Sequence, residues 1–589
     1  MKIVRKIETD VLVIGGGAAA SRTALAAVET GAHTTMVLKR KLGASGATNY
    51  PENVGSAWQA ADGCGGEGDT PDAHYADIMR AALGMADARM ARIQADEAPE
   101  RLLELESWGF DLIHDPKGGR PHYSGYSCFG TQPRAHGFEI GNTGGHTGNM
   151  IETLRNKFMP LGVQLEQDLA VVDLLVDNKV CTGALALNSD GDLVQFNASA
   201  VVMAVGGASQ MFPLSHTPGD ITGDGYAMAL RAGAELLNME FMQYMVRDVG
   251  GKAPRVGGPY WTLNPKMVDV DGNEILEANL PDGLSAEEVY LDRTLHYPFS
   301  SRDNSVWLDV AIERTVRAGR GGPHNGVFVD FSDVDISSVK PARPQHHPPA
   351  DILELGDDRI EVAHSAHAIN GGVRITENGE TSIPGFYAVG ETIAGPHGAD
   401  RLGGGMLGSC NVFGARTGKA AGEFAKATTR TDSGAAVETV LGRLADIGEK
   451  IDQPWNEVRG QLKKLAGASL VALRSKGSLT TMLSGLDELA VAGSGGTTKD
   501  SPDSQNTDLD KSLIRHIETA NLLTVAEVMT KAALSREESR GSHFREDFPT
   551  RNDDEWNTNL MWDLSETGLN SRRVKYRQNP DLDTQFVNT

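Results

Sequence analysis

Cysteine is rare in this sequence, and its few cysteines lie far apart. The chain of 589 residues contains only four, at Cys64, Cys128, Cys181 and Cys410. Zinc-binding motifs and iron–sulfur clusters take cysteines at short, regular spacings, so no local metal motif is present. We expect the four cysteines to be free thiols in a reducing compartment.

Long apolar runs and an excess of basic residues are missing as well. No segment approaches the ~18 uninterrupted apolar residues of a membrane-spanning helix, and no signal peptide or twin-arginine motif precedes the first predicted strand. Lys and Arg number 55 against 79 Asp and Glu, for a net charge of −24. This acidity argues against nucleic acid or an anionic membrane as the main partner. We therefore expect a cytoplasmic protein that is not integral to a membrane. The net charge says little about a small anionic substrate, because local arginines can outweigh the overall field.

The N-terminal sequence predicts a βαβ unit. Residues 6–38 contain an apolar strand, an alanine-rich helix that ends at a glycine, and a second strand. Between the first strand and the helix lies Gly15-x-Gly17-x-x-Ala20. The first glycine permits a tight turn, the second lets the backbone approach a pyrophosphate, and Ala20 allows close helix packing. In this context the motif predicts a dinucleotide cofactor.

The end of the second strand departs from the usual dinucleotide pattern. An acid normally follows that strand and binds the ribose hydroxyls, yet the sequence there is Leu38-Lys39-Arg40-Lys41. FAD tolerates this change better than NAD, because its contacts are spread along a longer molecule. Asp224 precedes a predicted helix at residues 226–232, where it can cap the helix or contact a cofactor hydroxyl. Both interpretations of Asp224 stay open.

A second glycine-rich region has the features of the other half of the same site. Residues 385–391 (GFYAVGE) predict a strand, and residues 397–405 (HGADRLGGG) predict a turn that can lie against a ring system. Glu391 can cap a helix or bond the ribityl chain of a flavin, and we favour the flavin. Gly206 and Gly207 end another strand and can pack their backbone against the same cofactor. Together these regions predict a flavin dinucleotide buried across distant parts of the chain.

The order of elements along the chain indicates an α/β protein with insertions. Strands predicted at 169–176, 180–187, 200–205 and 385–389 fit a mixed sheet, and residues 73–108 predict helix with an apolar stripe broken at Pro99. We predict a two-part Rossmann-like FAD-binding domain with an inserted α+β cap domain and a C-terminal helical domain. The boundaries are 1–235 and 353–430 for the FAD-binding domain, 236–352 for the cap (substrate) domain, 431–545 for the helical domain and 546–589 for an extended arm.

The order of motifs resembles that in the flavoprotein subunits of succinate dehydrogenase and fumarate reductase, with L-aspartate oxidase, adenylylsulfate reductase and 3-ketosteroid dehydrogenase as relatives. The most specific matches are residues 384–422 and residues 535–549 (SREESRGSHFREDFP). Other matching segments, in the same order, are 10–20, 72–109, 143–146, 204–243, 301–303 and 367–372. The resemblance covers most of the chain.

The resemblance implies an FAD enzyme that transfers a hydride between flavin N5 and a carbon next to an electron-withdrawing group. It implies that Arg302 donates a proton, that Arg401 clamps a substrate carboxylate through a bidentate pair that lysine cannot copy, and that His367 binds or polarises that carboxylate. From the residues alone, a lone arginine or histidine in such loops is usually structural. The predicted cofactor contacts are Gly15, Gly17, Ala18, Ala20, Lys39, Ser45, Gly46, Ala47, Thr48, Gly206, Gly207, Asp224, Gly390, Glu391, Arg401, Gly404, Met406 and Leu407.

Two departures from the family pattern bear on the chemistry. In succinate and fumarate enzymes a His-Pro-Thr-Gly segment holds the second carboxylate, whereas this sequence has Met245-Val-Arg247-Asp248 there, so a plain C4 dicarboxylate is a doubtful substrate. The histidine that binds flavin covalently in the respiratory enzymes would fall near residues 45–48, which contain none. We therefore expect non-covalent FAD. Three aromatic residues of the cap either widen an aromatic pocket or simply pack together: Tyr260, Trp261 and Tyr297.

Three alternatives remain at this point. The same fold can carry other FAD chemistry, such as amine or hydroxy-acid oxidation or a reaction like that of adenylylsulfate reductase. The chain can also be a flavoprotein subunit that works only with an iron–sulfur electron-transfer partner, because it has no cysteine cluster of its own. A relative that has lost its flavin would be colourless.

Overall fold

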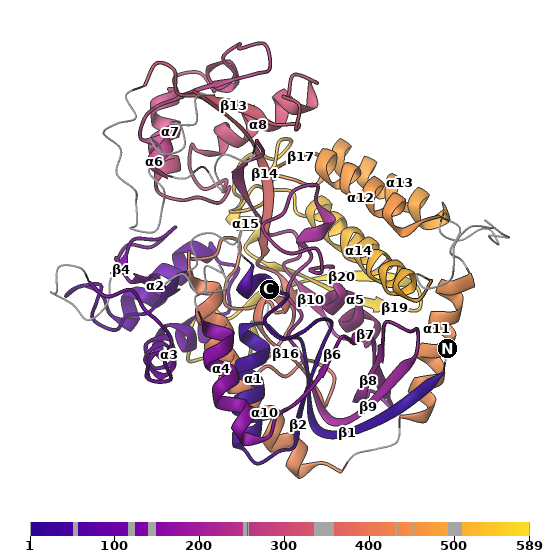
Figure 1. The fold of residues 1–589 in the computed structure, drawn as a ribbon. Coiled ribbons are helices and arrows are strands. Elements are labelled where there is room, and N and C mark those ends of the chain that lie inside the picture. The colour runs from indigo at the N-terminus through magenta and orange to yellow at the C-terminus, as the bar shows by residue number, and fades with distance from the viewer. Residues whose placement is uncertain are drawn as a thin grey trace.

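The protein is described by a computed structural model covering residues 2–50, 57–115, 124–138, 149–250, 256, 258–334, 358–429, 433–449, 453–492 and 509–587. Figure 1 shows a central sheet with helices beside it, a cap at the top of the view, and C-terminal helices on the right. The predicted domain boundaries at residues 352 and 430 fall outside the described residues. The segment 143–146 also falls outside them.

The central sheet has seven strands in a mixed arrangement. Its order is β6-β2-β1-β9-β8-β7, and β16 also pairs with β9. The contacts β1–β2, β2–β6, β1–β9 and β9–β16 are parallel, whereas β7–β8 and β8–β9 are antiparallel. The strand bounds are β1 (Ile3–Ile14), β2 (Thr34–Leu38), β6 (Gln164–Gln167), β7 (Ala170–Asp177), β8 (Val180–Leu187), β9 (Leu193–Met203) and β16 (Phe386–Ala388). The predicted mixed sheet is confirmed, with a late strand returning to its centre.

Helices α1 (Ala18–Glu29), α4 (Met150–Phe158) and α10 (Gly405–Ala427) lie together beside this sheet (Figure 1). Helix α1 is alanine-rich and almost completely buried. It packs so closely on α10 that a Cβ at Gly418 would lie 2.3 Å from the Thr23 carbonyl oxygen. Small residues on both helices therefore allow the close contact between them.

The segment predicted as helix at 73–108 forms two helices. α2 (Pro71–Ala82) ends at Leu83, and α3 (Ala88–Ser107) begins after Asp87. Leu83 and Gly84 have φ values of 52° and 85°, which a continuing α-helix cannot adopt, and the Asp87 carboxylate accepts from the Arg89 amide to cap α3. The interruption therefore lies at residues 83–87, and Pro99 is inside α3.

The cap lies above the central sheet in the view of Figure 1 and has its own sheet and hydrophobic core. Its four antiparallel strands are β11 (Met242–Asp248), β14 (Arg359–Ile369), β13 (Val327–Asp330) and β12 (Lys266–Val268). The helices are α6 (Gly258–Trp261), α7 (Ala286–Thr294) and α8 (Val306–Arg317). The core of the cap includes Tyr260 and Trp261, and Trp261 stacks on Tyr290 at 5.8 Å between ring centroids. These two aromatic residues of the sequence prediction therefore serve packing.

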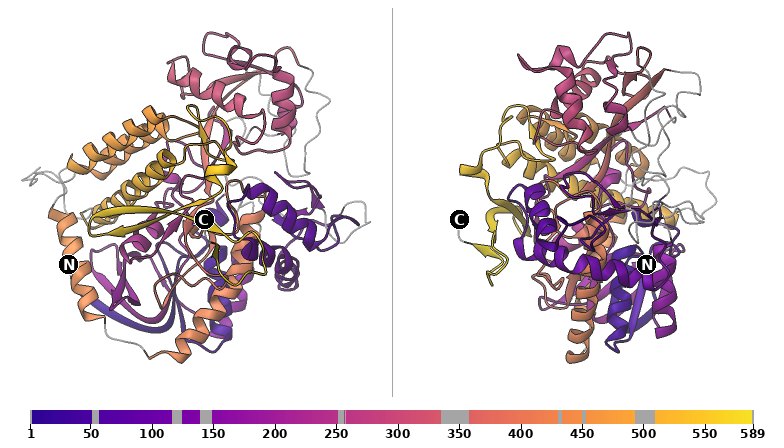
Figure 2. Two further views of the ribbon diagram at one scale, coloured as in Figure 1. Left: turned by 180° about the vertical axis from the view of Figure 1, so that it is seen from behind. Right: turned by 90° about the vertical axis from the view of Figure 1, so that its left-hand side faces the viewer.

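The C-terminal part adds helices and a further sheet. The helices are α11 (Gly434–Glu449), α12 (Trp455–Ser469), α13 (Lys476–Ala492), α14 (Leu509–Ser535) and α15 (Asp553–Trp556). The last residues form β19 (Asn559–Ser565), β20 (Gly568–Tyr576) and β21 (Phe586–Val587), which join β10 (Leu236–Leu237) and β15 (Gly372–Val373). Figure 2 shows these strands on the side of the molecule seen from behind. The residues expected as an extended arm thus belong to a five-stranded sheet.

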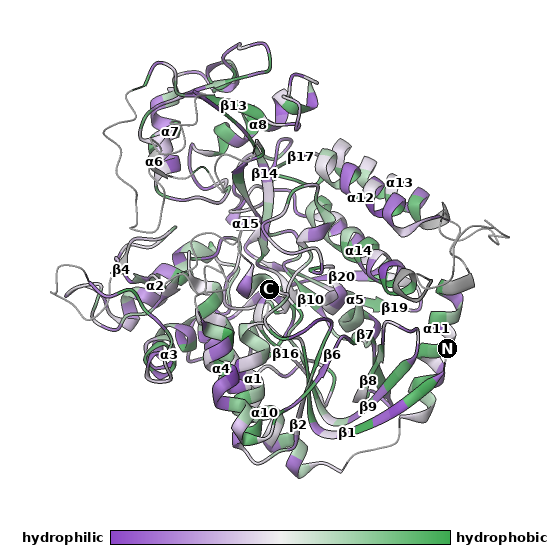
Figure 3. Ribbon diagram, in the orientation of Figure 1, coloured by the Kyte–Doolittle hydropathy of each residue, from purple (hydrophilic) through white to green (hydrophobic). Residues whose placement is uncertain are grey.

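Smaller elements complete the fold. β3 (Trp58–Gln59), β4 (Ser124–Gly125) and β5 (Ala135–His136) form a three-stranded sheet, β17 (Leu473–Arg474) pairs with β18 (Phe544–Arg545), and α5 is Asp224–Arg231. Figure 3 shows hydrophobic residues concentrated on the strands of the central sheet. Within the described residues, no helix combines the length and apolar character needed to cross a membrane.

Candidate cofactor and substrate site

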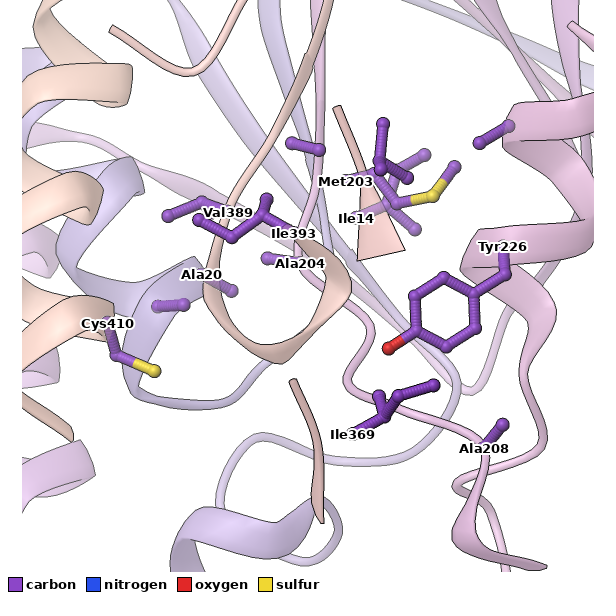
Figure 4. Close-up of a cluster of buried hydrophobic side chains, with 14 of the residues drawn as sticks. Ile14, Ala20, Met203, Ala204, Ala208, Tyr226, Ile369, Val389, Ile393 and Cys410 are labelled. Atoms are coloured by element: carbon purple, nitrogen blue, oxygen red, sulfur yellow. The ribbon is translucent and has the colours of Figure 1, made fainter. Parts of the chain in front are cut away.

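A cavity runs along the carboxyl ends of the parallel strands. The residues after β1, β2 and β9 line it: Ile14 to Ala19, Leu38 to Lys41, and Ala204 to Gly206. Ligands of α/β proteins bind at this edge of the sheet. Figure 4 shows a cluster of buried hydrophobic side chains near these strand ends, including Ile14, Met203, Ala204 and Val389.

The turn after β1 has the geometry that its glycines predict. Gly15 has a φ of 122°, and a Cβ on it would lie 2.2 Å from the Ala204 carbonyl oxygen. Gly17 is the residue before α1 and supplies no side-chain cap. The Ala18 amide donates to the Thr48 hydroxyl at 3.1 Å, and Gly17, Ala18 and Thr48 all line the cavity. A helix N-terminus exposed to a cavity is suited to bind a pyrophosphate. These residues fit a dinucleotide.

Lys39 follows β2, at the position where many dinucleotide-binding proteins have an acid that binds the ribose hydroxyls. Its Nζ lies 2.7 Å from Asp224 Oδ2 and 3.0 Å from Glu518 Oε1 of α14, and both Lys39 and Asp224 line the cavity. The Lys39 ammonium is the main favourable influence that keeps the pKa of Asp224 below its usual value against the opposing effect of burial. Asp224 is the first residue of α5 and Gly223 is its N-cap. The Asp224 carboxylate accepts from the side chains of Lys39, Thr222 and Asn521, so the capping interpretation is not supported. Its contact with a cofactor hydroxyl stays a prediction.

Glu391 lies in the short turn after β16 and faces the cavity. Its Oε1 accepts from the Ile369 amide at 3.1 Å, and its backbone oxygen accepts from the Tyr226 hydroxyl at 2.8 Å; Figure 4 shows Tyr226 beside this turn. A Cβ on Gly207 would lie 2.3 Å from Glu391 Oε1. Gly207 therefore does not line the cavity itself but leaves room for the carboxylate that does. Burial raises the pKa of Glu391 to about 7.

This shifted pKa predicts a pH-dependent stability difference in FAD-depleted protein. Because the folded-state pKa of about 7 exceeds the usual 4.5, Glu391 contributes stability below pH 4.5 that is lost as the pH rises through 7. The melting temperature of wild type minus that of Glu391→Gln should therefore fall between these pH values and level off above them. A thermal-shift series on both proteins measures it. A difference that rises with pH would contradict the assignment.

Two of the three predicted catalytic residues meet at the other end of the cavity. A terminal nitrogen of Arg401 lies 3.2 Å from His367 Nε2, and both residues line the cavity. β14 carries His367, and Arg401 lies in the glycine-rich turn before α10. Burial lowers the pKa of Arg401, partly offset by the charge of Glu391. A buried guanidinium beside an imidazole, open to a cavity, is suited to bind a carboxylate.

Around this pair the wall is a mixture of small, polar and apolar side chains. The His216 and His367 rings meet edge to face, with centroids 6.1 Å apart. Met245 of β11 and Tyr297 of the cap also line the cavity. Tyr297 therefore belongs to the pocket, in contrast to the other two aromatic residues singled out in the sequence.

Arg302 lies close to this end but is not among the cavity-lining residues. Its Nε and one terminal nitrogen lie 3.0 Å and 2.8 Å from Asp400 Oδ2, and that terminal nitrogen also donates to the Ala81 carbonyl. Its guanidinium lies 4.2 Å from the centre of the Phe129 ring. Asp400 is fully buried and immediately precedes Arg401 in the chain, and its Oδ2 also accepts from the Ser300 hydroxyl at 2.7 Å. The role of Arg302 as proton donor stays a prediction.

Most of the predicted cofactor residues line one cavity. Those that do are Gly15, Gly17, Ala18, Lys39, Ser45, Gly46, Ala47, Thr48, Gly206, Asp224, Gly390, Glu391, Arg401, Gly404, Met406 and Leu407. Ala20 does not; it lies in α1 and is buried in the core, as close helix packing requires. The sequence prediction did not single out several other lining residues, among them Ser127, Cys128, His216, Thr217, Asp220, Ile221 and Cys410. Of these, Thr217 and Asp220 lie in a Gly- and Thr-rich segment before Asp224, which is a signal that points to them.

Comparisons with known proteins agree with this geometry. A family model described as "FAD binding domain" matches residues 10–407, and one described as "Fumarate reductase flavoprotein C-term" matches residues 459–585. The chain is 30% identical over 580 residues to one of the subunits of the fumarate reductase (CoM/CoB) of Methanothermobacter marburgensis, covering 94% of this chain and 97% of that protein. It is 29% identical over 588 residues to the fumarate reductase flavoprotein subunit of Mycobacterium tuberculosis, covering 92% and 93%.

Solved structures show the same fold. Mycobacterium smegmatis Sdh1 in complex with UQ1 matches with a TM-score of 0.82 at 26% identity, covering 98% of this chain and 96% of that one. An adenosine-5-phosphosulfate reductase in complex with sulfite matches with a TM-score of 0.72 at 18% identity, covering 98% and 97%, and shares the fold. The chain therefore belongs to the FAD-binding flavoprotein family of fumarate reductase and succinate dehydrogenase subunits, and it is an FAD-dependent oxidoreductase.

Proposed function

We propose that this enzyme oxidises a C–C bond or reduces a C=C bond next to the carboxylate of its substrate. The observation that carries the proposal is the buried contact between Arg401 and His367 at 3.2 Å in the wall of the cofactor cavity. When bound, FAD supplies hydride transfer at its ring nitrogen N5. The name of the relative from Methanothermobacter marburgensis, which belongs to a fumarate reductase, supports this class of reaction.

The chain's own residues have three tasks in this proposal. Arg401 and His367 hold the substrate carboxylate, which fixes the reacting carbon in place. The cap, through Tyr297, helps to exclude water from the reacting atoms. Arg302 delivers a proton on the opposite face of the substrate, with the buried carboxylate of Asp400 as its hydrogen-bonded partner.

We infer that the substrate has one bound carboxylate rather than two. Succinate and fumarate enzymes have a His-Pro-Thr-Gly segment at this position. In this chain Met245 occupies the position and lines the cavity. Arg247 is not among the cavity-lining residues, and one of its nitrogens donates to the Ser215 carbonyl. An apolar side chain at this position favours an uncharged group on the far end of the substrate, because an unpaired carboxylate would lose its hydration there.

A spectroscopic panel tests the reaction class. Reduced enzyme is mixed without oxygen with fumarate and with α,β-unsaturated monocarboxylates, and oxidised enzyme is mixed with succinate, amino acids, hydroxy acids and sulfite. We expect the monocarboxylates to restore the flavin absorbance most rapidly. Bleaching by amino acids, hydroxy acids or sulfite alone would favour the alternative chemistries of this fold.

Arg401→Lys should weaken this reaction selectively. Lysine cannot form the two parallel bonds to a carboxylate, and a lost hydrogen bond to a charged group costs about 1.5–3 kcal/mol. We expect kcat/KM to fall roughly 10- to 100-fold, while the protein stays yellow. Steady-state kinetics and FAD content measure the two effects. An unchanged kcat/KM would contradict the carboxylate clamp.

Two further properties belong to the proposal. We infer non-covalent FAD, because residues 45–48 line the cavity without a histidine; acid precipitation should release all of the flavin. We also infer an iron–sulfur electron-transfer partner, because the relative from Methanothermobacter marburgensis is named as one component of a multi-subunit enzyme. Full turnover with a natural electron donor by the chain alone would count against such a partner.

A further inference from the structure

A cluster of potential metal ligands lies outside the cofactor cavity. Asp62, Cys64 and His136 place one carboxylate oxygen, the Sγ atom and one ring nitrogen within 4.8 Å of one another. Cys64 is 2% exposed, and the side chains of His136 and Asp62 are 0% and 4% exposed. None of the three residues lines the cofactor cavity. The proposed hydride transfer and carboxylate binding leave these residues without a task.

The orientation of His136 is fixed by its backbone neighbours. Its Nδ1 lies 2.9 Å from the Arg134 carbonyl oxygen and 3.3 Å from the Trp58 carbonyl oxygen. Carbonyl oxygens only accept hydrogen bonds, so Nδ1 carries the hydrogen and Nε2 faces the cluster. Metal-binding histidines characteristically donate their second ring N–H to such an acceptor. His136 is therefore held in the tautomer and orientation that a metal ligand needs.

A positive charge has to lie between Nε2 and the groups it faces. Nε2 is 3.0 Å from Asp62 Oδ2, the Cys64 amide donates to Asp62 Oδ1 at 3.0 Å, and Cys64 Sγ lies within 4.8 Å of the ligand atoms of both other residues. A ring nitrogen lone pair would repel the carboxylate at this distance. A proton on Nε2, donated to Asp62 Oδ2, removes this repulsion. A divalent metal ion satisfies the same three atoms.

Asp69 adds a second buried carboxylate to the same loop. Its Oδ1 accepts from Arg134 Nε at 2.6 Å, while its Oδ2 has no hydrogen-bond partner among the described residues. The side chain of Asp69 is 0% exposed. A Cβ on Gly65, the residue after Cys64, would lie 2.2 Å from this unpaired oxygen. A buried carboxylate oxygen without a donor is costly, and a cation held by the neighbouring residues lowers that cost.

We propose that Asp62, Cys64 and His136 bind one Zn²⁺ ion through a carboxylate oxygen, Sγ and Nε2. A mixed oxygen, sulfur and nitrogen set matches zinc, which accepts all three donors in tetrahedral geometry, and excludes Mg²⁺ and Ca²⁺, which take oxygen ligands. The fourth position goes to water or, after a side-chain shift, to Asp69. Binding displaces the proton on His136 and the thiol proton of Cys64, because both ligands coordinate in their deprotonated forms.

The position of the cluster connects the metal to the cofactor site. His136 is in β5, which pairs with β3, where Trp58 lies opposite His136. The Gln59 side chain of β3 donates to the Gly403 carbonyl at 2.8 Å, and Gly403 lines the cofactor cavity. A metal that ties β5 to the loop at residues 60–69 would stiffen the strand beneath this turn. Metal-loaded enzyme should therefore release FAD more slowly than metal-free enzyme.

The test uses the full-length protein with FAD bound. After treatment with a chelator, the enzyme is dialysed to equilibrium against Zn²⁺, and bound zinc is counted by mass spectrometry of the metal. We expect about one zinc per chain, and X-ray absorption of the zinc should show one sulfur at ~2.3 Å and lighter ligands at ~2.0 Å. Cys64→Ala and Asp62→Asn should lose the zinc. Cys181→Ala, which removes a cysteine that is buried in β8 away from the cluster, should keep it.

The outcomes separate the proposal from its alternatives. FAD content is measured on every variant, so that only folded protein is compared. Wild type that takes up no zinc, or zinc without a sulfur neighbour, would overturn the proposal without using any variant. Equal zinc binding by wild type and both folded ligand variants would overturn it too. The inference does not depend on the substrate, because the metal count requires no turnover.

Discussion

Gly15→Ala is expected to give a colourless protein that retains no FAD. Gly15 lies in the turn between β1 and α1, where its φ of 122° and the 2.2 Å between an added Cβ and the Ala204 carbonyl oxygen leave no room for a side chain. The clashing atom belongs to the backbone at the end of β9, which is paired with β1 and cannot move alone. Relief requires the turn to shift into the space that the pyrophosphate would occupy.

Gly31→Ala is the matched control for this variant. Gly31 lies just after α1 and has a φ of 86°, but a Cβ added there would meet no atom within 4 Å. Both variants carry the strain of a left-handed residue, on the order of 1–2 kcal/mol, and only Gly15→Ala adds the clash. Flavin content by absorbance should stay near one per chain in Gly31→Ala. A yellow Gly15→Ala protein with normal FAD affinity would contradict the placement of the cofactor.

Arg302→Lys is expected to lower kcat by ~10²–10⁴, the usual range for the loss of a general acid, with FAD content unchanged. Two nitrogens of Arg302 bind the same oxygen of Asp400 while one of them also bonds the Ala81 carbonyl. A lysine has a single nitrogen and cannot keep these contacts and reach the substrate as well. FAD stays bound because Arg302 is not among the cavity-lining residues.

Arg314→Lys provides the control for a change of this type in the cap. Arg314 lies in α8, where its guanidinium pairs with Glu546 in an exposed ion pair, and exposed pairs contribute ~0–1 kcal/mol. Its kcat should match wild type. The dependence of kcat on pH in Arg302→Lys distinguishes two roles of Arg302, proton transfer and positioning. Only the loss of a proton donor changes the shape of that pH profile. Near-normal turnover of Arg302→Lys would show that the proton takes another route.

The parts of the fold that follow from local sequence were predictable. The β1–α1–β2 unit has an apolar strand, a glycine turn and an alanine-rich helix in direct succession, and the structure contains each of them. The break at residues 83–87 was not predictable in the same way, because Leu83 takes a positive φ without being glycine. The pairing of β19 with β10 was not predictable from local sequence either, because it joins strands more than three hundred residues apart.

The candidate site was likewise predictable only where the local sequence marks it. Glycine-rich turns identified the parts of the cavity wall after β1, after β9 and before α10, because close approach of backbone to a cofactor leaves a mark in the sequence. His216 and Cys128 reach the wall through tertiary packing alone, and nothing in their neighbourhoods distinguishes them from core residues. The cluster of Asp62, Cys64 and His136 is of this kind too. Its cysteine has no second cysteine nearby in the sequence, and the histidine is brought to it by the pairing of β3 with β5.

The most direct test of the account compares an α,β-unsaturated monocarboxylic acid with its own primary amide as oxidant of the reduced flavin. The two compounds have nearly the same shape, and only the acid carries the charge that Arg401 and His367 are placed to bind. Stopped-flow absorbance without oxygen gives both rate constants. We expect the acid to react faster by roughly tenfold or more. Equal rates for the acid and the amide would contradict a carboxylate site in this cavity.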